Sequence, residues 1–304
     1  MKVQLAGLTL ANPVIAASGT FGYGIEFEEI VNLERLGAFV TKGISLEPMQ
    51  GNRAPRLIQT AAGMLNAIGL QNVGVEDFIA KKLPGLKRYP HANVIVNVFG
   101  YTVGDYVAVV ERLNRAEGIA AYELNVSCPN VHAGGMAFGS DAGSLEYLVG
   151  RVKNVSTRPI IVKLSPNVTS IAQMAQISES AGAAAVSLVN TFLAMSIDVE
   201  TRQPRLTNIT GGLSGPAIKP IALRMVYETA RAVKIPVVGM GGILTPEDAV
   251  EFLLAGAAAV QVGTASYADP RATERLAKGL ESWCRGHHVE TVKSLTGALE
   301  IPKP

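Results

Sequence analysis

The chain has 304 residues, of which 48% are hydrophobic and 17% are charged, as in a globular protein with a large core. Its 27 basic and 25 acidic side chains leave a net charge of +2, which gives no reason to expect nucleic acid or an acidic membrane surface as a partner. Two cysteines make no disulfide framework, and the amino-terminal segment has no signal-peptide pattern, so we expect a cytoplasmic protein. The most apolar stretch, 181–197, is interrupted by Asn190 and Thr191 and is not expected to span a membrane.

The chain begins with a predicted hairpin, in which residues 3–5 and 8–10 flank Ala6-Gly7. Short apolar runs rich in β-branched residues then recur along the chain. They predict eight strands, at residues 14–17, 38–41, 94–99, 122–126, 159–164, 184–189, 236–239 and 258–262.

Helical spacing of apolar residues between these strands predicts helices at 26–36, 75–83, 103–116, 145–155, 170–181, 218–233 and 270–283. Ser140 or Asp141 is expected to cap one helix, and Thr245, followed by Pro246, to start another. Residues 44–71 are predicted to be an irregular stretch that is too long for an ordinary connection, and loops of that length are usually functional or disordered. Residues 192–215 are predicted to be another long connection.

This alternation of strands and helices predicts an α/β protein with a single (β/α)8 TIM barrel domain over residues 1–304, a small amino-terminal hairpin and long insertions at its active face. A doubly wound open sheet is the competing fold. It would require a domain boundary in one of the two long connections, and neither has the composition of a linker.

Polar residues gather where the predicted strands end, at the face where such barrels place their active sites. They are Ser18, Lys42, Asn97, Asn125, Cys128, Lys163, Asn190 and Thr191. The loops after the last two strands carry Gly241-Gly242 and Gly263-Thr264. One such pair indicates only a tight turn, but both pairs at these two places favour a phosphate site built from backbone amides.

Lys42 and Lys163 end apolar strands, where a buried ammonium group needs an anionic or electron-rich ligand because acidic residues are scarce at the predicted strand ends. The strand-end asparagines offer both donors and acceptors, which suits a planar ligand with amide or imide edges. We therefore predict flavin mononucleotide (FMN), one per chain, and no metal. Cys128 begins a glycine-rich loop and is either a small buried hydrophobe or a reactive thiol.

The motifs together resemble the dihydroorotate dehydrogenases of pyrimidine biosynthesis. In chain order they are ASGTFG, TKG, NAIGL, NVFG, ELNVSCPN, VKLSPN, SLVNT, GGLSGPA, GMGGI and QVGTA. The cysteine in NVSCPN is similar to that of the class 1 enzymes, and the continuation VHAGGMAFG resembles the NAD-linked subclass 1B rather than the fumarate-linked subclass 1A.

The resemblance implies roles for individual residues. FMN would be held by Ser18, Lys42, Gly43, Asn97, Asn125, Lys163, Val189, Gly215, Gly241, Gly242, Gly263 and Thr264. Dihydroorotate would be held by Lys42, Asn66, Ala67, Ile68, Gly69, Leu70, Asn125, Asn190 and Thr191. Cys128 and Lys42 would be catalytic, with Cys128 as the base that removes the C5 proton while a hydride leaves C6 for the flavin N5.

Subclass 1B also implies a partner subunit that carries FAD and a [2Fe–2S] cluster and passes electrons to NAD, in a heterotetramer built on a homodimer of catalytic chains. With two cysteines, this chain cannot supply the four thiolates of such a cluster. The alternatives are a fumarate-dependent 1A enzyme, a dihydropyrimidine dehydrogenase-like barrel, a flavin-free sugar-phosphate isomerase or lyase, and a non-catalytic phosphate binder.

Overall fold

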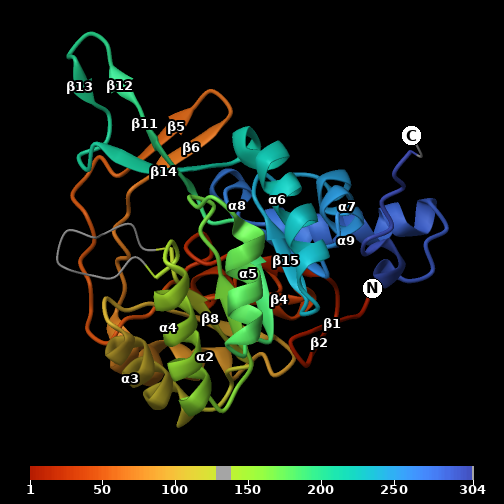
Figure 1. Ribbon diagram of the computed structural model, residues 1–304, viewed down its shortest axis with the longest axis horizontal. Coiled ribbons are helices and arrows are strands. Elements are labelled where there is room, and N and C mark those ends of the chain that lie inside the picture. The colour runs from red at the N-terminus through yellow and green to blue at the C-terminus, as the bar shows by residue number, and fades with distance from the viewer. Residues whose placement is uncertain (128–137, 303–304) are drawn as a thin grey trace.

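The computed structural model describes residues 1–127 and 138–302, and its centre is a closed barrel of eight parallel strands (Figure 1). The strands follow one another around the barrel in chain order, and the last pairs with the first. The predicted (β/α)8 barrel is therefore confirmed, with every predicted strand present. The strands are β3 (Val14–Ala16), β4 (Ala38–Val40), β7 (Val94–Val98), β8 (Ala121–Asn125), β9 (Ile160–Lys163), β10 (Ala185–Leu188), β15 (Val237–Met240) and β16 (Ala259–Val262).

Amphipathic helices surround the barrel and bury their apolar faces against it (Figure 1). They are α3 (Val103–Asn114), α4 (Ala142–Val155), α5 (Ile171–Ser180), α6 (Lys219–Ala232), α7 (Pro246–Leu254), α8 (Ala265–Ala268) and α9 (Ala272–Gly286). The predicted helix 75–83 is a composite of α1 (Gly74–Asp77), a π-helical turn (Phe78–Lys82) and α2 (Leu83–Leu86). Asp141 caps α4 by accepting from the Ser144 amide at 2.8 Å, and Thr245 caps α7 as predicted.

The predicted helix over residues 26–36 is wrong. The segment contains only two 3₁₀ turns, Ile25–Phe27 and Leu33–Arg35. Between them Asn32 is extended (φ −76°, ψ 102°), and its side chain accepts a hydrogen bond from the Glu34 amide. An asparagine that bonds to nearby backbone competes with the helix, which explains why the apolar spacing did not suffice. Other 3₁₀ turns are Pro216–Ile218 and Val292–Leu295.

The connection 44–71 is not irregular as predicted, because it pairs with the other long connection, 192–215. Together they form a four-stranded antiparallel sheet in the order β11 (Phe192–Met195), β14 (Thr210–Ser214), β6 (Gly63–Asn66) and β5 (Leu57–Thr60). A hairpin of β12 (Ile197–Asp198) and β13 (Gln203–Pro204) projects from this sheet away from the barrel (Figure 1). The predicted amino-terminal hairpin is confirmed as β1 (Val3–Leu5) and β2 (Leu8–Leu10).

No helix within residues 1–127 and 138–302 is long and apolar enough to cross a bilayer.

Candidate cofactor and substrate site

A cavity of about 950 Å³ is lined by residues at the carboxyl ends of the barrel strands and by the insertions. All the predicted site residues that the structure describes line this one cavity, which brings together positions up to 246 residues apart in sequence. They are Ser18, Lys42, Gly43, Asn66, Ala67, Ile68, Gly69, Leu70, Asn97, Asn125, Lys163, Val189, Asn190, Thr191, Gly215, Gly241, Gly242, Gly263 and Thr264. The predicted base, Cys128, lies outside the described residues; the preceding residues Val126 and Ser127 line the cavity.

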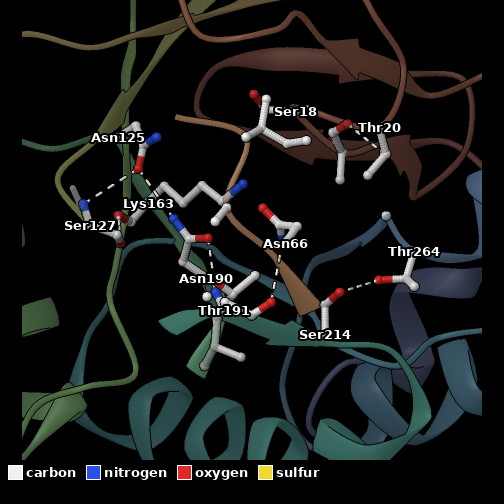
Figure 2. Close-up of a pocket in the computed structure, with 18 of the residues that line it drawn as sticks. Ser18, Thr20, Asn66, Asn125, Ser127, Lys163, Asn190, Thr191, Ser214 and Thr264 are labelled. Atoms are coloured by element: carbon white, nitrogen blue, oxygen red, sulfur yellow. Dashed lines mark hydrogen bonds between the residues drawn. The ribbon is translucent and has the colours of Figure 1, made fainter. Parts of the chain in front are cut away.

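One part of the cavity is a cradle of closely packed loops. Gly215, Gly241 and Gly242 have φ angles of 93°, 129° and 74°, which side-chain-bearing residues rarely adopt. A Cβ on Gly242 would lie 2.8 Å from the carbonyl oxygen of Gly215, so the two loops approach each other as only glycine allows. The Thr264 hydroxyl donates to the Ser214 hydroxyl at 2.8 Å (Figure 2). Bare amides and hydroxyls in this arrangement suit a phosphate.

The described lining contains three cationic side chains, Lys42, Arg56 and Lys163, and no carboxylate. Burial lowers the pKa of Lys42, nearby Arg56 lowers it further, and Glu26 partly opposes the shift. The Arg56 guanidinium is held by the Gln71 side chain at 2.6 Å and the Asn52 carbonyl at 3.1 Å. Sequence reasoning missed Arg56, which lies in a long insertion whose path depends on tertiary pairing. Together these cations favour an anionic ligand.

The polar groups of β8 and of the chain after β10 hold one another in place. Asn190 donates to Asn125 Oδ1 at 3.2 Å, and Asn190 Oδ1 accepts from the Thr191 amide at 2.9 Å (Figure 2). Asn125 Oδ1 is thus occupied, and the amide nitrogen of Asn125 has no partner within residues 1–127 and 138–302, so it can donate to a ligand. Asn66, at the end of β6, donates to the Gly212 carbonyl at 3.3 Å, and its side-chain oxygen has no donor in the part of the chain that the structure describes.

Lys163 is buried, with 6% of its surface exposed, and its ammonium lies 4.0 Å from a carboxylate that the sequence analysis did not identify, that of Glu123. Glu123 lies on β8 two residues before Asn125, so both side chains are on the face of the strand opposite to Tyr122 and Leu124. That shared face of the strand was the signal available in the sequence. Glu123 does not line the cavity, but it gives Lys163 an acidic partner, so the prediction that Lys163 lacks one is wrong.

The described residues fit FMN on three observations: the glycine cradle suits a phosphate, the cations suit an electron-rich ring, and two buried acceptors lack partners. Asn97 Oδ1 and Gln261 Oε1 are buried without a hydrogen-bond partner among the described residues, and both side chains line the cavity. Unpaired buried acceptors cost about 1–3 kcal/mol each, which a ligand N–H would recover. Within the described residues no cluster of His, Cys, Asp or Glu could hold a metal ion.

These features define a (β/α)8 barrel with a glycine-rich, cation-lined cavity at the carboxyl ends of its strands. A sequence model described as dihydroorotate dehydrogenase matches residues 1–283, and the chain belongs to that family.

Several similar proteins carry the name "Dihydroorotate dehydrogenase B (NAD(+)), catalytic subunit". That of Citrifermentans bemidjiense is 54% identical over 301 residues, covering 99% of this chain and 98% of the relative. Those of Pelobacter propionicus and Geobacter sulfurreducens are 55% and 54% identical, with the same coverage. The resemblance inferred from the motifs is confirmed at the level of the family.

Proposed function

We propose that this chain is the catalytic subunit of an NAD-linked dihydroorotate dehydrogenase, which oxidises dihydroorotate to orotate in pyrimidine biosynthesis. The observation that carries the proposal is the described cavity lining, which combines a glycine cradle, three cations and oriented asparagines without a carboxylate. Such a lining suits a phosphorylated cofactor and an anionic substrate in one site. The names of the relatives support this reaction rather than a sugar-phosphate isomerisation.

FMN, when bound, supplies the acceptor for the hydride from C6 of dihydroorotate. The protein's own groups bind and orient the reactants and handle the proton. Lys42 and the Asn125–Asn190 pair hold the substrate, with the segment Asn66, Ala67, Ile68, Gly69 and Leu70 on another side of the cavity. We assign Cys128 as the base that takes the C5 proton, which follows from the family resemblance.

The proposal includes a second protein. The relatives are named as catalytic subunits of NAD-linked enzymes, which supports a partner that accepts the electrons. We assign to it FAD, a [2Fe–2S] cluster and the NAD site, in a heterotetramer of two catalytic and two partner chains. We treat residues 1–304 as one domain because the insertions and the barrel strands line the same cavity. A cytoplasmic location is supported by the low cysteine content.

The direct test is to purify the chain expressed alone, record its visible spectrum and add dihydroorotate under anaerobic conditions. We expect a yellow protein whose flavin absorbance bleaches on addition of substrate, with orotate formed in equal amount. NAD reduction should then require the partner subunit. Bleaching that is reversed by fumarate would instead identify a 1A-type enzyme. A colourless protein that cannot be reconstituted with FMN would contradict the proposal and favour the sugar-phosphate barrel.

Orotate binding should weaken as the pH rises through the pKa of Lys42. Burial and Arg56 lower this pKa, so Lys42 loses its charge at a lower pH than an ordinary lysine. The protonated form pairs with the ligand carboxylate, so affinity should fall by about tenfold per pH unit above that pKa. Titrations of the FMN-loaded protein with orotate across the alkaline range measure this. Lys42→Arg keeps its charge and should flatten the profile; an equal decline in both proteins would exclude Lys42 as the cause.

Gly242→Ala should weaken FMN binding by about tenfold or more, because the added Cβ meets the Gly215 carbonyl oxygen at 2.8 Å and the φ of 74° disfavours alanine. Fluorescence quenching of free FMN on titration with apoprotein gives the affinity. Gly286→Ala is the matched control, because a Cβ there meets nothing within 4 Å. Similar affinities in the two variants would argue against a phosphate in the glycine cradle.

A further inference from the structure

Glu123 is a fully buried carboxylate whose hydrogen bonds reach three other barrel strands. Its Oε1 accepts from Asn97 Nδ2 at 2.8 Å, and its Oε2 accepts from the Ser187 hydroxyl at 2.9 Å and from Gln261 Nε2 at 2.7 Å. Lys163 Nζ lies 4.0 Å from Oε1. Glu123 itself does not line the cavity, whereas Asn97, Gln261 and Lys163 do.

The carboxylate determines how the two amides face the cavity. A carboxylate has only acceptors, so Asn97 and Gln261 must both turn their NH₂ groups toward Glu123. Their carbonyl oxygens then point elsewhere, and these are two of the buried atoms that lack a partner among the described residues. A Cβ on Gly43 would lie 3.0 Å from Asn97 Oδ1, so this oxygen is next to a second residue of the cavity wall.

The same carboxylate opposes the charge of Lys163. The Lys163 side chain is 8% exposed and the Glu123 side chain 0%, so little water screens their interaction. The negative charge of Glu123 therefore reduces the positive potential that Lys163 produces in the cavity. A flavin ring gains negative charge when it is reduced. Lys163 paired with Glu123 would stabilise that charge less than an unpaired Lys163 would.

We propose that Glu123 is a positioning residue for the FMN site: it presents the Asn97 and Gln261 oxygens as acceptors to N–H or O–H groups of FMN and limits how strongly Lys163 favours reduced FMN. The inference rests on the proposed function, since it requires that the cavity binds FMN. It assigns a role to a side chain that touches neither the cavity nor the reacting atoms.

Binding of oxidised and of chemically reduced FMN to the apoprotein tests this without any measurement of turnover. Glu123→Gln removes the charge and adds an NH₂ group that competes with the two amides. Oxidised FMN should bind more weakly, while the ratio of reduced to oxidised affinity should rise by about tenfold, equivalent to about 30 mV for a two-electron couple. Glu123→Asp keeps a carboxylate, so its ratio should stay near that of the original protein although the shorter side chain weakens packing.

If Glu123 had a purely structural role, Glu123→Asp would change FMN binding more than Glu123→Gln, because glutamine matches the size of glutamate and aspartate does not. Glu274→Gln is the control, since Glu274 is a largely buried glutamate on α9 that does not line the cavity. A redox-affinity ratio in Glu123→Gln equal to that of Glu274→Gln overturns the inference while leaving the proposed function intact. An unmodified protein that binds no FMN overturns both.

Gln261→Leu provides a second route if Glu123→Gln does not fold. It removes the Gln261 Oε1 acceptor together with the Nε2 donor to Glu123, and it leaves the charges of Glu123 and Lys163 in place. Affinity should fall about threefold to tenfold in both redox states, the value of one hydrogen bond, with an unchanged ratio. Unchanged affinity in both states would overturn the assignment of Gln261 Oε1 as a ligand acceptor.

Discussion

Replacing Cys128 by alanine is expected to lower the rate of dihydroorotate oxidation by about 10²–10⁴-fold, the usual contribution of a general base. FMN should remain bound, because Asn97, Lys163 and the glycine cradle are held by contacts with other described residues. Anaerobic stopped-flow reduction of the bound flavin isolates this half-reaction from the acceptor. Near-normal reduction in the variant would contradict the assignment of Cys128 as the base.

The chain contains a matched control in its other cysteine. Cys284 lies on α9, is buried with 4% of its surface exposed, and does not line the cavity. Burial raises the pKa of its thiol, which is the opposite of what a base requires. Cys284→Ala should therefore reduce flavin at the original rate, and a large loss in this variant would indicate a general effect of thiol removal on the fold.

The pH dependence of the same half-reaction tests the chemical form of the base. A free thiol has a pKa near 8.5, and the thiolate is the basic form, so the rate should rise with pH until deprotonation is complete. Cys128→Ser should be strongly impaired at every pH, because a hydroxyl is a far poorer base. A serine variant as active as the original protein would exclude a thiolate mechanism.

Lys163→Met is expected to give the second large effect, a loss of about 3 kcal/mol in the free energy of unfolding of the apoprotein together with much weaker FMN binding. The substitution leaves the Glu123 carboxylate buried without its cation, and it removes a cation from the cavity. The cost belongs at the low end of the range for buried pairs, because Glu123 retains three hydrogen bonds from neutral groups. Urea unfolding of the apoprotein measures it.

Lys278→Met is the matched surface control. Lys278 pairs with Glu274 at 3.2 Å, but its side chain is 59% exposed, and exposed pairs contribute less than about 1 kcal/mol. The double variant Lys163→Met with Glu123→Gln should recover part of the lost stability, since it no longer buries an unpaired charge. An equal loss in the free energy of unfolding for Lys163→Met and Lys278→Met would contradict a buried Lys163–Glu123 pair. So would a double variant that is no more stable than Lys163→Met.

Patterns local in the sequence were sufficient to predict the barrel and the location of its site. Each barrel strand is a short apolar run, and the helices that follow show their own spacing, so the eightfold alternation was visible residue by residue. Because parallel strands place their carboxyl ends at one face, Lys42, Asn97, Asn125 and Lys163 could be assigned to a common cavity without coordinates. The exception was residues 26–36, where a single side-chain-to-backbone bond at Asn32 overrode apolar spacing.

Features that depend on contacts between residues distant in sequence became visible only in the tertiary structure. Strands β6 and β14 are only four and five residues long, contain glycine, and pair across about 146 residues, so neither had a recognisable pattern by itself. Arg56 reaches the cavity only because that sheet holds its loop in place. Glu123 looked like one polar residue alternating along a strand. Two of its hydrogen-bond partners, Ser187 on β10 and Gln261 on β16, come from strands that do not adjoin β8, and they meet Glu123 only when the barrel closes. Hydrogen bonds between such distant segments leave no periodic signal in the chain.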